Sequence, residues 1–137
     1  MLSADIQPRE GYLCAAVTGE YNLAQAQELY RHVLRSALRH RLARILVDCT
    51  RIAGVPSMSE RRDFGIFQAE EHDKLRSRMD EELHIVILAL PPFFDPSRYG
   101  ESVAQNRGVK MKAVERLEDA LLWLGVGEKP GAGSDFS

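Results

Sequence analysis

The sequence predicts an α/β domain with a mainly parallel sheet of about five strands and helices packed on it. Short apolar runs alternate with longer segments whose apolar residues recur at helical spacing. This strand–helix alternation repeats four times after a first short edge strand. One run, residues 83–90, is apolar almost throughout, which is typical of a parallel strand buried on both faces. The length of 137 residues, with 45% hydrophobic and 28% charged content, is typical of one soluble globular domain.

The chain begins with a predicted hairpin. Residues 6–9 suit a short edge strand, because Pro8 cannot donate a hydrogen bond to a sheet ladder. Residues 10–11 carry a turn signal. Residues 12–18 then form the first convincing strand, which Gly19 ends.

The first helix is predicted to begin after Asn22. Asn22 and Gln25 have the spacing of a capping box, in which each residue bonds the backbone of the other. The cations at the carboxyl end of this helix complement the helix dipole, so we interpret them as a solvated helix end and not as a phosphate site. The apolar stripe that identifies the helix consists of Leu23, Ala26, Tyr30, Val33 and Ala37, with Leu34 and Leu38 beside it.

The central strand, predicted over residues 45–49, leads into polar residues. Asp48 lies at the carboxyl end of a parallel strand, where α/β sheets place ligand-binding groups. With Thr50 and Arg51 it could bind a polar ligand or serve an enzyme. Its structural alternative is to accept hydrogen bonds from loop amides or to pair with Arg51. We favour the structural role, because no second catalytic partner is evident nearby.

The second helix is predicted to begin at Ser57, with Glu60 completing a capping box. A helix N-terminus stabilises a phosphate, which makes Ser57 a candidate phosphorylation site. The simpler role is that of the N-cap, worth about 1 kcal/mol, and we favour it. The charged residues between Glu70 and Glu82 leave the end of this helix undefined.

The remaining elements follow the strand at residues 83–90. Two prolines end that strand, and a loop with Phe93 and Phe94 follows. Ser97 is expected to cap a short helix that Gly108 ends. The last two predicted elements are an edge strand at residues 109–114, with lysines on its solvent side, and a helix at residues 117–124. They complete the domain over residues 1–124, and a flexible tail is expected over residues 125–137.

Composition excludes several function classes. A net charge of −2 is not that of a nucleic-acid binder. Cys14 and Cys49 lie in apolar runs and are expected to be buried thiols of a reducing compartment. No signal peptide or membrane-spanning run is present, so we expect a cytoplasmic protein that does not insert into membranes. The histidines lack metal-ligand spacing, and no catalytic or cofactor motif was found, so we expect no enzyme, no cofactor and no metal.

Three segments resemble the SpoIIAA-like (STAS) fold family, specifically its small bacterial single-domain branch, described as STAS/SEC14-like. They are Ile45-Leu46-Val47-Asp48, residues 101–108 (ESVAQNRG) and residues 118–124 (EDALLWL). With the order of elements, the resemblance covers most of residues 5–124. It implies a mixed, mainly parallel sheet with helices packed on it.

The resemblance also implies a regulatory role. In the anti-sigma-factor antagonists of this superfamily, a partner kinase phosphorylates a serine that follows an Asp at the start of the second helix, and this controls partner binding. The comparable residues here are Val55-Pro56-Ser57-Met58-Ser59. Pro56 replaces the acid and no Gly-Leu-Gly follows, so this sequence departs from the phosphorylation pattern.

The leading expectation is therefore a non-enzymatic regulatory or protein-interaction module that uses residues 57–62 and the loops at the strand carboxyl ends. The alternative is a carrier or sensor of a small apolar, lipid-like ligand, in a pocket lined by phenylalanines together with Met58 and Met79. The phenylalanines could instead be core residues, and Phe93 and Phe94 could instead form an exposed contact patch for another chain. A homodimer is left open. The candidate ligand- or partner-binding residues are Asp48, Thr50, Arg51, Ser57, Arg61, Phe64, Phe67, Phe93 and Phe94.

Overall fold

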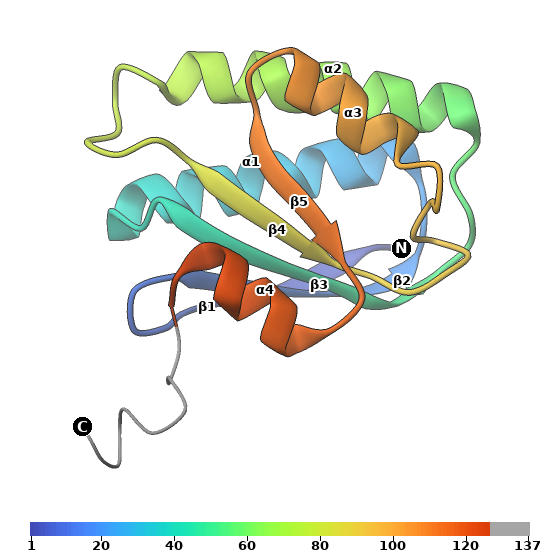
Figure 1. Ribbon diagram of the computed structural model, residues 1–137, viewed down its shortest axis with the longest axis horizontal. Coiled ribbons are helices and arrows are strands. Elements are labelled where there is room, and N and C mark those ends of the chain that lie inside the picture. The colour runs from blue at the N-terminus through green and yellow to red at the C-terminus, as the bar shows by residue number, and fades with distance from the viewer. Residues whose placement is uncertain (127–137) are drawn as a thin grey trace.

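The computed structural model describes residues 1–126 of the chain, and they form a mixed five-stranded sheet with helices on both faces (Figure 1). The strand order is β1-β2-β3-β4-β5. Only β1 runs antiparallel to its neighbour, and the other pairs are parallel. The strands are β1 Ser3–Pro8, β2 Leu13–Glu20, β3 Arg44–Ala53, β4 His84–Leu88 and β5 Lys110–Val114. The helices are α1 Leu23–His40, α2 Met58–Leu75, α3 Tyr99–Asn106 and α4 Leu117–Leu124.

Two cores lie on the two faces of the sheet. The larger core contains the inward residues of β2, β3 and β4, such as Leu13, Ile45 and Ile85, together with residues of α1, α2 and α3. The smaller core joins Leu46 and Val86 to α4, the helix in front of the sheet in Figure 1. The predicted fold class, an α/β domain with a mainly parallel sheet, is confirmed.

The helix starts follow the predicted caps in part. Asn22 Oδ1 accepts from Gln25 N at 3.0 Å, but the Gln25 side chain accepts from Leu2 N instead of completing a box. At α2 the box is complete, since Ser57 Oγ accepts from Glu60 N at 3.1 Å and Glu60 Oε1 accepts from Ser57 N at 2.8 Å. The side chains of Asn22 and Ser57 therefore fix where both long helices begin.

Several boundaries differ from the sequence-based expectation. Strand β1 spans Ser3–Pro8 and not residues 6–9, and β2 continues past Gly19 to Glu20. Strand β3 continues to Ala53, because a register shift opposite Ala16 and Thr18 lets its last residues pair with β2. Helix α3 is not capped by Ser97. Instead Asp95 Oδ2 accepts from the Tyr99 amide at 3.1 Å.

Helices α2 and α3 approach each other backbone to backbone. A Cβ atom on Gly65 of α2 would lie 2.8 Å from the carbonyl oxygen of Gly100, and a Cβ atom on Gly100 would lie 2.9 Å from that of Arg61. Only glycine fits at such an approach. The pair therefore holds the start of α3 against the first turns of α2.

Helix α4 ends at Gly125, which has a φ of 74°. Of the tail predicted over residues 125–137, residues 127–137 lie outside the described part of the chain. Within residues 1–126, none of the helices combines the length and the apolarity needed to span a bilayer.

Candidate functional site

A cavity of about 180 Å³ lies between the sheet and helices α1, α2 and α3. Its floor is formed by Val47, Ile87 and Ala113, which stand side by side on β3, β4 and β5. Ile87 belongs to a central strand under a helical layer, yet it is only partly buried. The cavity above it explains this exposure.

The walls of the cavity are mainly apolar side chains from the helices. Leu29 and Val33 come from α1, and Phe64 comes from α2. Helix α2 packs closely against α3 and also contacts α1. The chemistry of the walls is that of a site for an apolar group.

Partly buried residues of the cavity lining lie near the strand carboxyl ends. Tyr21 follows β2, Ile52 belongs to the last part of β3, and Phe93 follows β4. The ring centroids of Tyr21 and Phe93 are 6.0 Å apart with an interplanar angle of 59°. Burial raises the pKa of the Tyr21 hydroxyl to about 12, so it is a neutral hydrogen-bonding group at physiological pH.

Arg61 joins α2 to the loop after β4. Its guanidinium donates to the carbonyl oxygens of Phe93 at 2.9 Å and of Pro92 at 3.3 Å. Arg61 also lines the cavity, and its backbone meets Gly100. One side chain thus connects the loop, α2 and the cavity lining.

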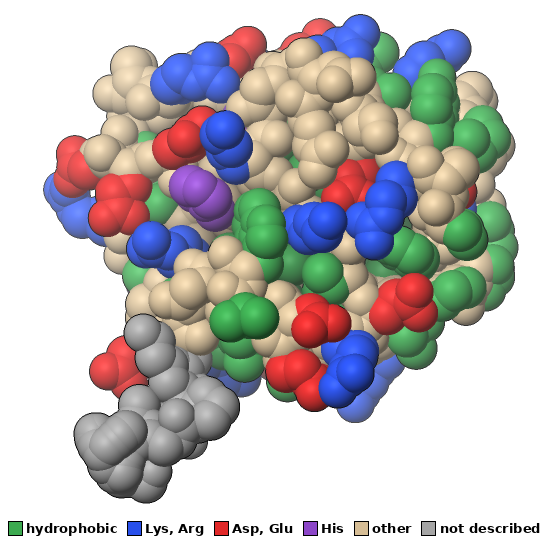
Figure 2. Space-filling model, viewed as in Figure 1, with side chains coloured by type: hydrophobic (Ala, Val, Ile, Leu, Met, Phe, Trp, Pro, Cys, Tyr) green, Lys and Arg blue, Asp and Glu red, His purple; other side chains and the backbone are tan. Residues whose placement is uncertain are grey.

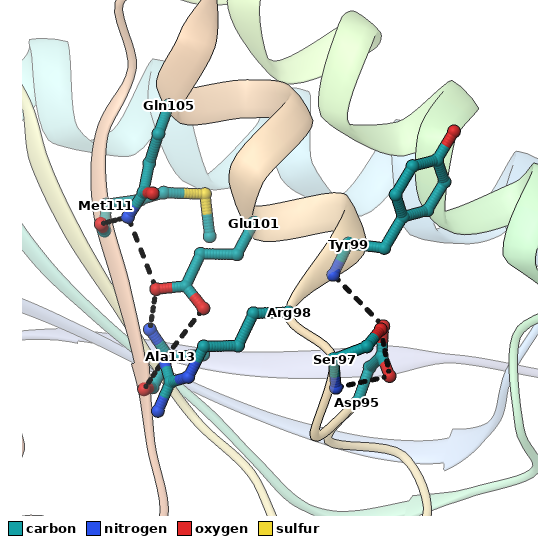
Figure 3. A network of polar contacts seen from close by, with 8 residues as sticks. All are labelled: Asp95, Ser97, Arg98, Tyr99, Glu101, Gln105, Met111 and Ala113. Atoms are coloured by element: carbon teal, nitrogen blue, oxygen red, sulfur yellow. Dashed lines mark hydrogen bonds and ion pairs between the residues drawn. The ribbon is translucent and has the colours of Figure 1, made fainter.

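A polar network joins α3 to the outer edge of β5 (Figure 3). Glu101 is buried, and its carboxylate accepts from Arg98 Nη1 at 2.8 Å and from the Ala113 amide at 3.1 Å. Arg98 also donates to the Ala113 carbonyl at 3.0 Å, and Gln105 donates to the Met111 carbonyl at 2.8 Å. The α3 side chains therefore occupy hydrogen-bonding positions that another strand would use.

The turn before α3 is organised by Asp95, which also lines the cavity. Its carboxylate accepts from the Ser97 amide and hydroxyl and from the Tyr99 amide (Figure 3). Although desolvation acts in the opposite direction, the hydrogen bonds from Ser97 and Tyr99 lower the pKa of Asp95. Asp95 is therefore an ionised structural acceptor, not a catalytic acid.

A buried polar cluster connects α1 and α2. The Tyr30 hydroxyl lies 2.8 Å from His72 Nε2 and accepts from Gln68 Nε2 at 3.3 Å. Burial lowers the pKa of His72 to about 4, and the nearby cation of Arg76 adds to this effect. His72 is therefore neutral at physiological pH and can accept the Tyr30 proton in a hydrogen bond.

The structure separates Asp48 from the cavity. Leu46 packs with α4, whereas Val47 and Cys49 belong to the core under α1–α3. Because side chains alternate along a strand, Asp48 faces the α4 side of the sheet. Its Oδ1 accepts from the amide of Thr50 at 3.0 Å and from the hydroxyl of Thr50 at 2.7 Å, as its structural role predicts. Arg51 is exposed.

The predicted phenylalanine pocket is partly assembled. Phe64, Phe93 and Phe94 line the cavity together with Arg61, but Phe67 does not. Phe67 packs in the core, 5.7 Å from the Phe64 ring and 6.0 Å from the Tyr30 ring.

Three other residues named in the sequence analysis lie outside the cavity lining. Met58 is exposed at the start of α2, and Met79 lies near the end of α2, away from the cavity. Ser57 is exposed and acts as the α2 cap.

Several residues of the site escaped the sequence analysis. Ile87 and Ala113 look like ordinary strand residues, and no local pattern marks a cavity above them. Arg98 and Glu101 resemble a surface ion pair, although their spacing, continued by Gln105, places all three on one face of α3 beside an edge strand. That spacing is the feature of the sequence from which a shared network of these three side chains could have been predicted.

The described residues contain no assembled metal or nucleophile site. Within residues 1–126, no cluster of three or more His, Cys, Asp or Glu could hold a metal ion. Burial raises the pKa of Cys49 to about 12, and the neighbouring Asp48 raises it further, so its thiol is not an activated nucleophile.

No protein-family model matches the sequence, and neither does any curated protein. The structure is similar to an anti-sigma factor antagonist from Mycobacterium paratuberculosis, with a TM-score of 0.61 and 13% sequence identity over 92% of this chain and 96% of that one. It is also similar to an uncharacterised protein with a SpoIIAA-like fold from Shewanella loihica, with a TM-score of 0.50 and 21% identity over 90% and 93% of the two chains. These similarities show that the chain has the SpoIIAA-like fold.

Proposed function

We propose that this SpoIIAA-like domain is a non-enzymatic regulatory module that binds a protein partner. The proposal draws on the shared fold with an anti-sigma factor antagonist, a protein whose name describes a regulatory interaction. Fold alone does not determine function, so the argument depends on the surface of this chain.

The observation that carries the proposal is an exposed apolar surface at the strand carboxyl ends. We call it the loop-end surface and define it by Val55, Met58, Leu90 and Tyr99, all exposed. They come from the loop after β3, the start of α2, the loop after β4 and the start of α3. Figure 2 shows hydrophobic side chains gathered on the right, where Figure 1 places these loops. Exposed apolar residues grouped in this way are typical of an interaction site.

Local contacts give the loop-end surface a fixed shape. Arg61 bonds the loop after β4, and the close approach of Gly65 and Gly100 holds α3 on α2. A surface that is already ordered loses little conformational entropy when a partner binds. Ser57 lies in this surface as a capping residue, and partner binding as proposed here does not require its phosphorylation.

Affinity capture with matched variants tests the proposal. Met58→Asp places a charge in the loop-end surface at a side chain that is 50% exposed, and Leu122→Asp places one on α4 at a residue that is 79% exposed. A partner captured by the wild type and by Leu122→Asp, but lost with Met58→Asp, would support the loop-end surface. Capture that depends equally on both residues, or turnover of a metabolite by the purified protein, would contradict the proposal.

We further propose a cytoplasmic location, because Cys14 and Cys49 are free thiols in a chain that forms no disulfide among its described residues. A homodimer stays a prediction. The β5 edge would not serve it, because α3 side chains occupy that edge. Light scattering of the purified protein would measure the oligomeric state.

The second candidate function is that of a carrier or sensor of a small apolar ligand. The cavity under α1, α2 and α3 favours it, since a concave, mainly apolar space with a few polar groups is typical of ligand sites. Native mass spectrometry of the protein purified from its own cells tests it. A bound small molecule would support the carrier function, and a bare chain would contradict it.

A further inference from the structure

We infer that the cavity accepts a small uncharged molecule about the size of one aromatic ring, and that Tyr21 and Phe93 form its entrance. The inference rests on the second candidate function for the existence of a ligand. It adds the size, the charge and the route of that ligand.

The volume sets the size of the ligand. An apolar cavity of roughly 150 Å³ in another protein stays dry and binds benzene or xenon. The cavity here, at about 180 Å³, is only slightly larger. One ring with a short substituent fits this space, whereas a lipid with a long acyl chain would not be enclosed.

The charged residues in the lining are already paired, which sets the charge of the ligand. Arg61 donates to two backbone carbonyls, and Arg98 is bonded to Glu101 and to the Ala113 carbonyl. Asp95 accepts from the turn before α3. A charged ligand would have to break one of these pairs or be buried without a counter-ion, and both are costly. An uncharged ligand meets neither cost.

The positions of two lining residues on loops indicate the entrance. Val33 of α1 and Val47 of β3 are buried, whereas Tyr21 and Phe93 lie on loops and are only partly buried. Their rings meet between two connections, the one after β2 and the one after β4. Side chains that lie on loops can change rotamer on fast timescales, so rotation of these rings would admit a ligand without moving the helices.

Ring compounds of equal size and different charge test the inference on the full-length protein. Benzyl alcohol, benzoate and benzylammonium are titrated separately while the methyl resonances of Val47 and Ile87 are followed by NMR. We expect saturable shifts with benzyl alcohol and binding at least tenfold weaker with the two ions. Equal binding of benzoate, or no shift with benzyl alcohol, would overturn the inference.

Variants test the place and the route. Ala113→Leu fills the cavity from the floor, and Ala26→Leu fills it from α1, so either variant that remains folded should lose benzyl alcohol binding. Phe93→Ala should increase both the association and the dissociation rate severalfold while the dissociation constant changes by less than about threefold. Binding that survives filling refutes the cavity as the site, and unchanged exchange rates in Phe93→Ala refute the entrance.

The experiments distinguish a failure of this inference from a failure of the proposed carrier function. A bare chain in native mass spectrometry together with selective benzyl alcohol binding would end the carrier proposal and keep the inference. A co-purifying charged or long-chain molecule would keep the carrier proposal and overturn the inference.

Discussion

Acidification should destabilise the protein through His72. The folded state lowers the pKa of this imidazole from 6.5 to about 4, so the unfolded chain binds the proton at a higher pH than the folded chain. The stabilisation is present in full above pH 6.5 and is lost as the pH falls towards 4. A difference of about 2.5 pH units at 1.36 kcal/mol each predicts a loss of about 3 kcal/mol.

The hydrogen bonds of the buried cluster give this shift a structural cause. Gln68 donates to the Tyr30 hydroxyl, which can donate its own proton to His72 Nε2. Protonated His72 would present a donor at that nitrogen and leave the Tyr30 proton without an acceptor. Arg76 opposes the added charge, whereas the nearby carboxylates Asp73 and Glu71 favour it.

Urea unfolding of the wild type and of His72→Gln at several pH values measures the effect. Glutamine cannot be protonated and can still accept from Tyr30, so the variant is the matched control. The wild-type advantage in unfolding free energy should shrink by about 3 kcal/mol between neutral pH and pH 4. A difference between the two proteins that stays constant over this range would refute the reasoning, as would an NMR titration of His72 with a midpoint near 6.5.

Three further changes probe the packing and the caps. Gly65→Ala should lower the unfolding free energy by about 1–3 kcal/mol, because its methyl group would press on the Gly100 carbonyl. Ser102→Ala, on the exposed side of α3, is the control. An equal loss of unfolding free energy in both variants would contradict the close approach of the two helices. Ser57→Ala should lower the free energy of unfolding, measured in urea, by about 1 kcal/mol, and Ser57→Asp should lower it much less. An unchanged unfolding free energy in Ser57→Ala would rule out the capping role. Glu101→Ala should cost about 2 kcal/mol in the same assay, because it leaves the Ala113 amide unpaired, while no loss would show that water replaces the carboxylate.

The sheet was predictable because its signals are local. The apolar runs at residues 12–18, 45–49 and 83–90 became the neighbouring strands β2, β3 and β4. The caps at Asn22 and Ser57 followed from residue type and spacing alone. The end of β3 at Ala53 did not, because a register shift against β2 extends the strand and leaves no mark in its own residues.

The site was less predictable because it depends on how distant segments meet. Asp48 was a candidate ligand-binding residue at a strand carboxyl end, but alternation along β3 turns it towards α4, and a shift of one residue would have reversed this. The Glu101 network also depends on backbone atoms of β5, and the side-chain sequence does not show which backbone atoms a side chain will meet. The cavity arises from the spacing of helices over small and β-branched residues, which periodicity does not report.

The cover of the β5 edge has a consequence for the solution behaviour of the protein. Exposed strand edges act as templates on which other chains polymerise, and many proteins prevent this with charges or prolines in the strand itself. Here part of that protection comes from a neighbouring helix, through Arg98, Glu101 and Gln105. Substitutions in α3, more than those in β5, should therefore decide whether the protein precipitates or forms fibrils.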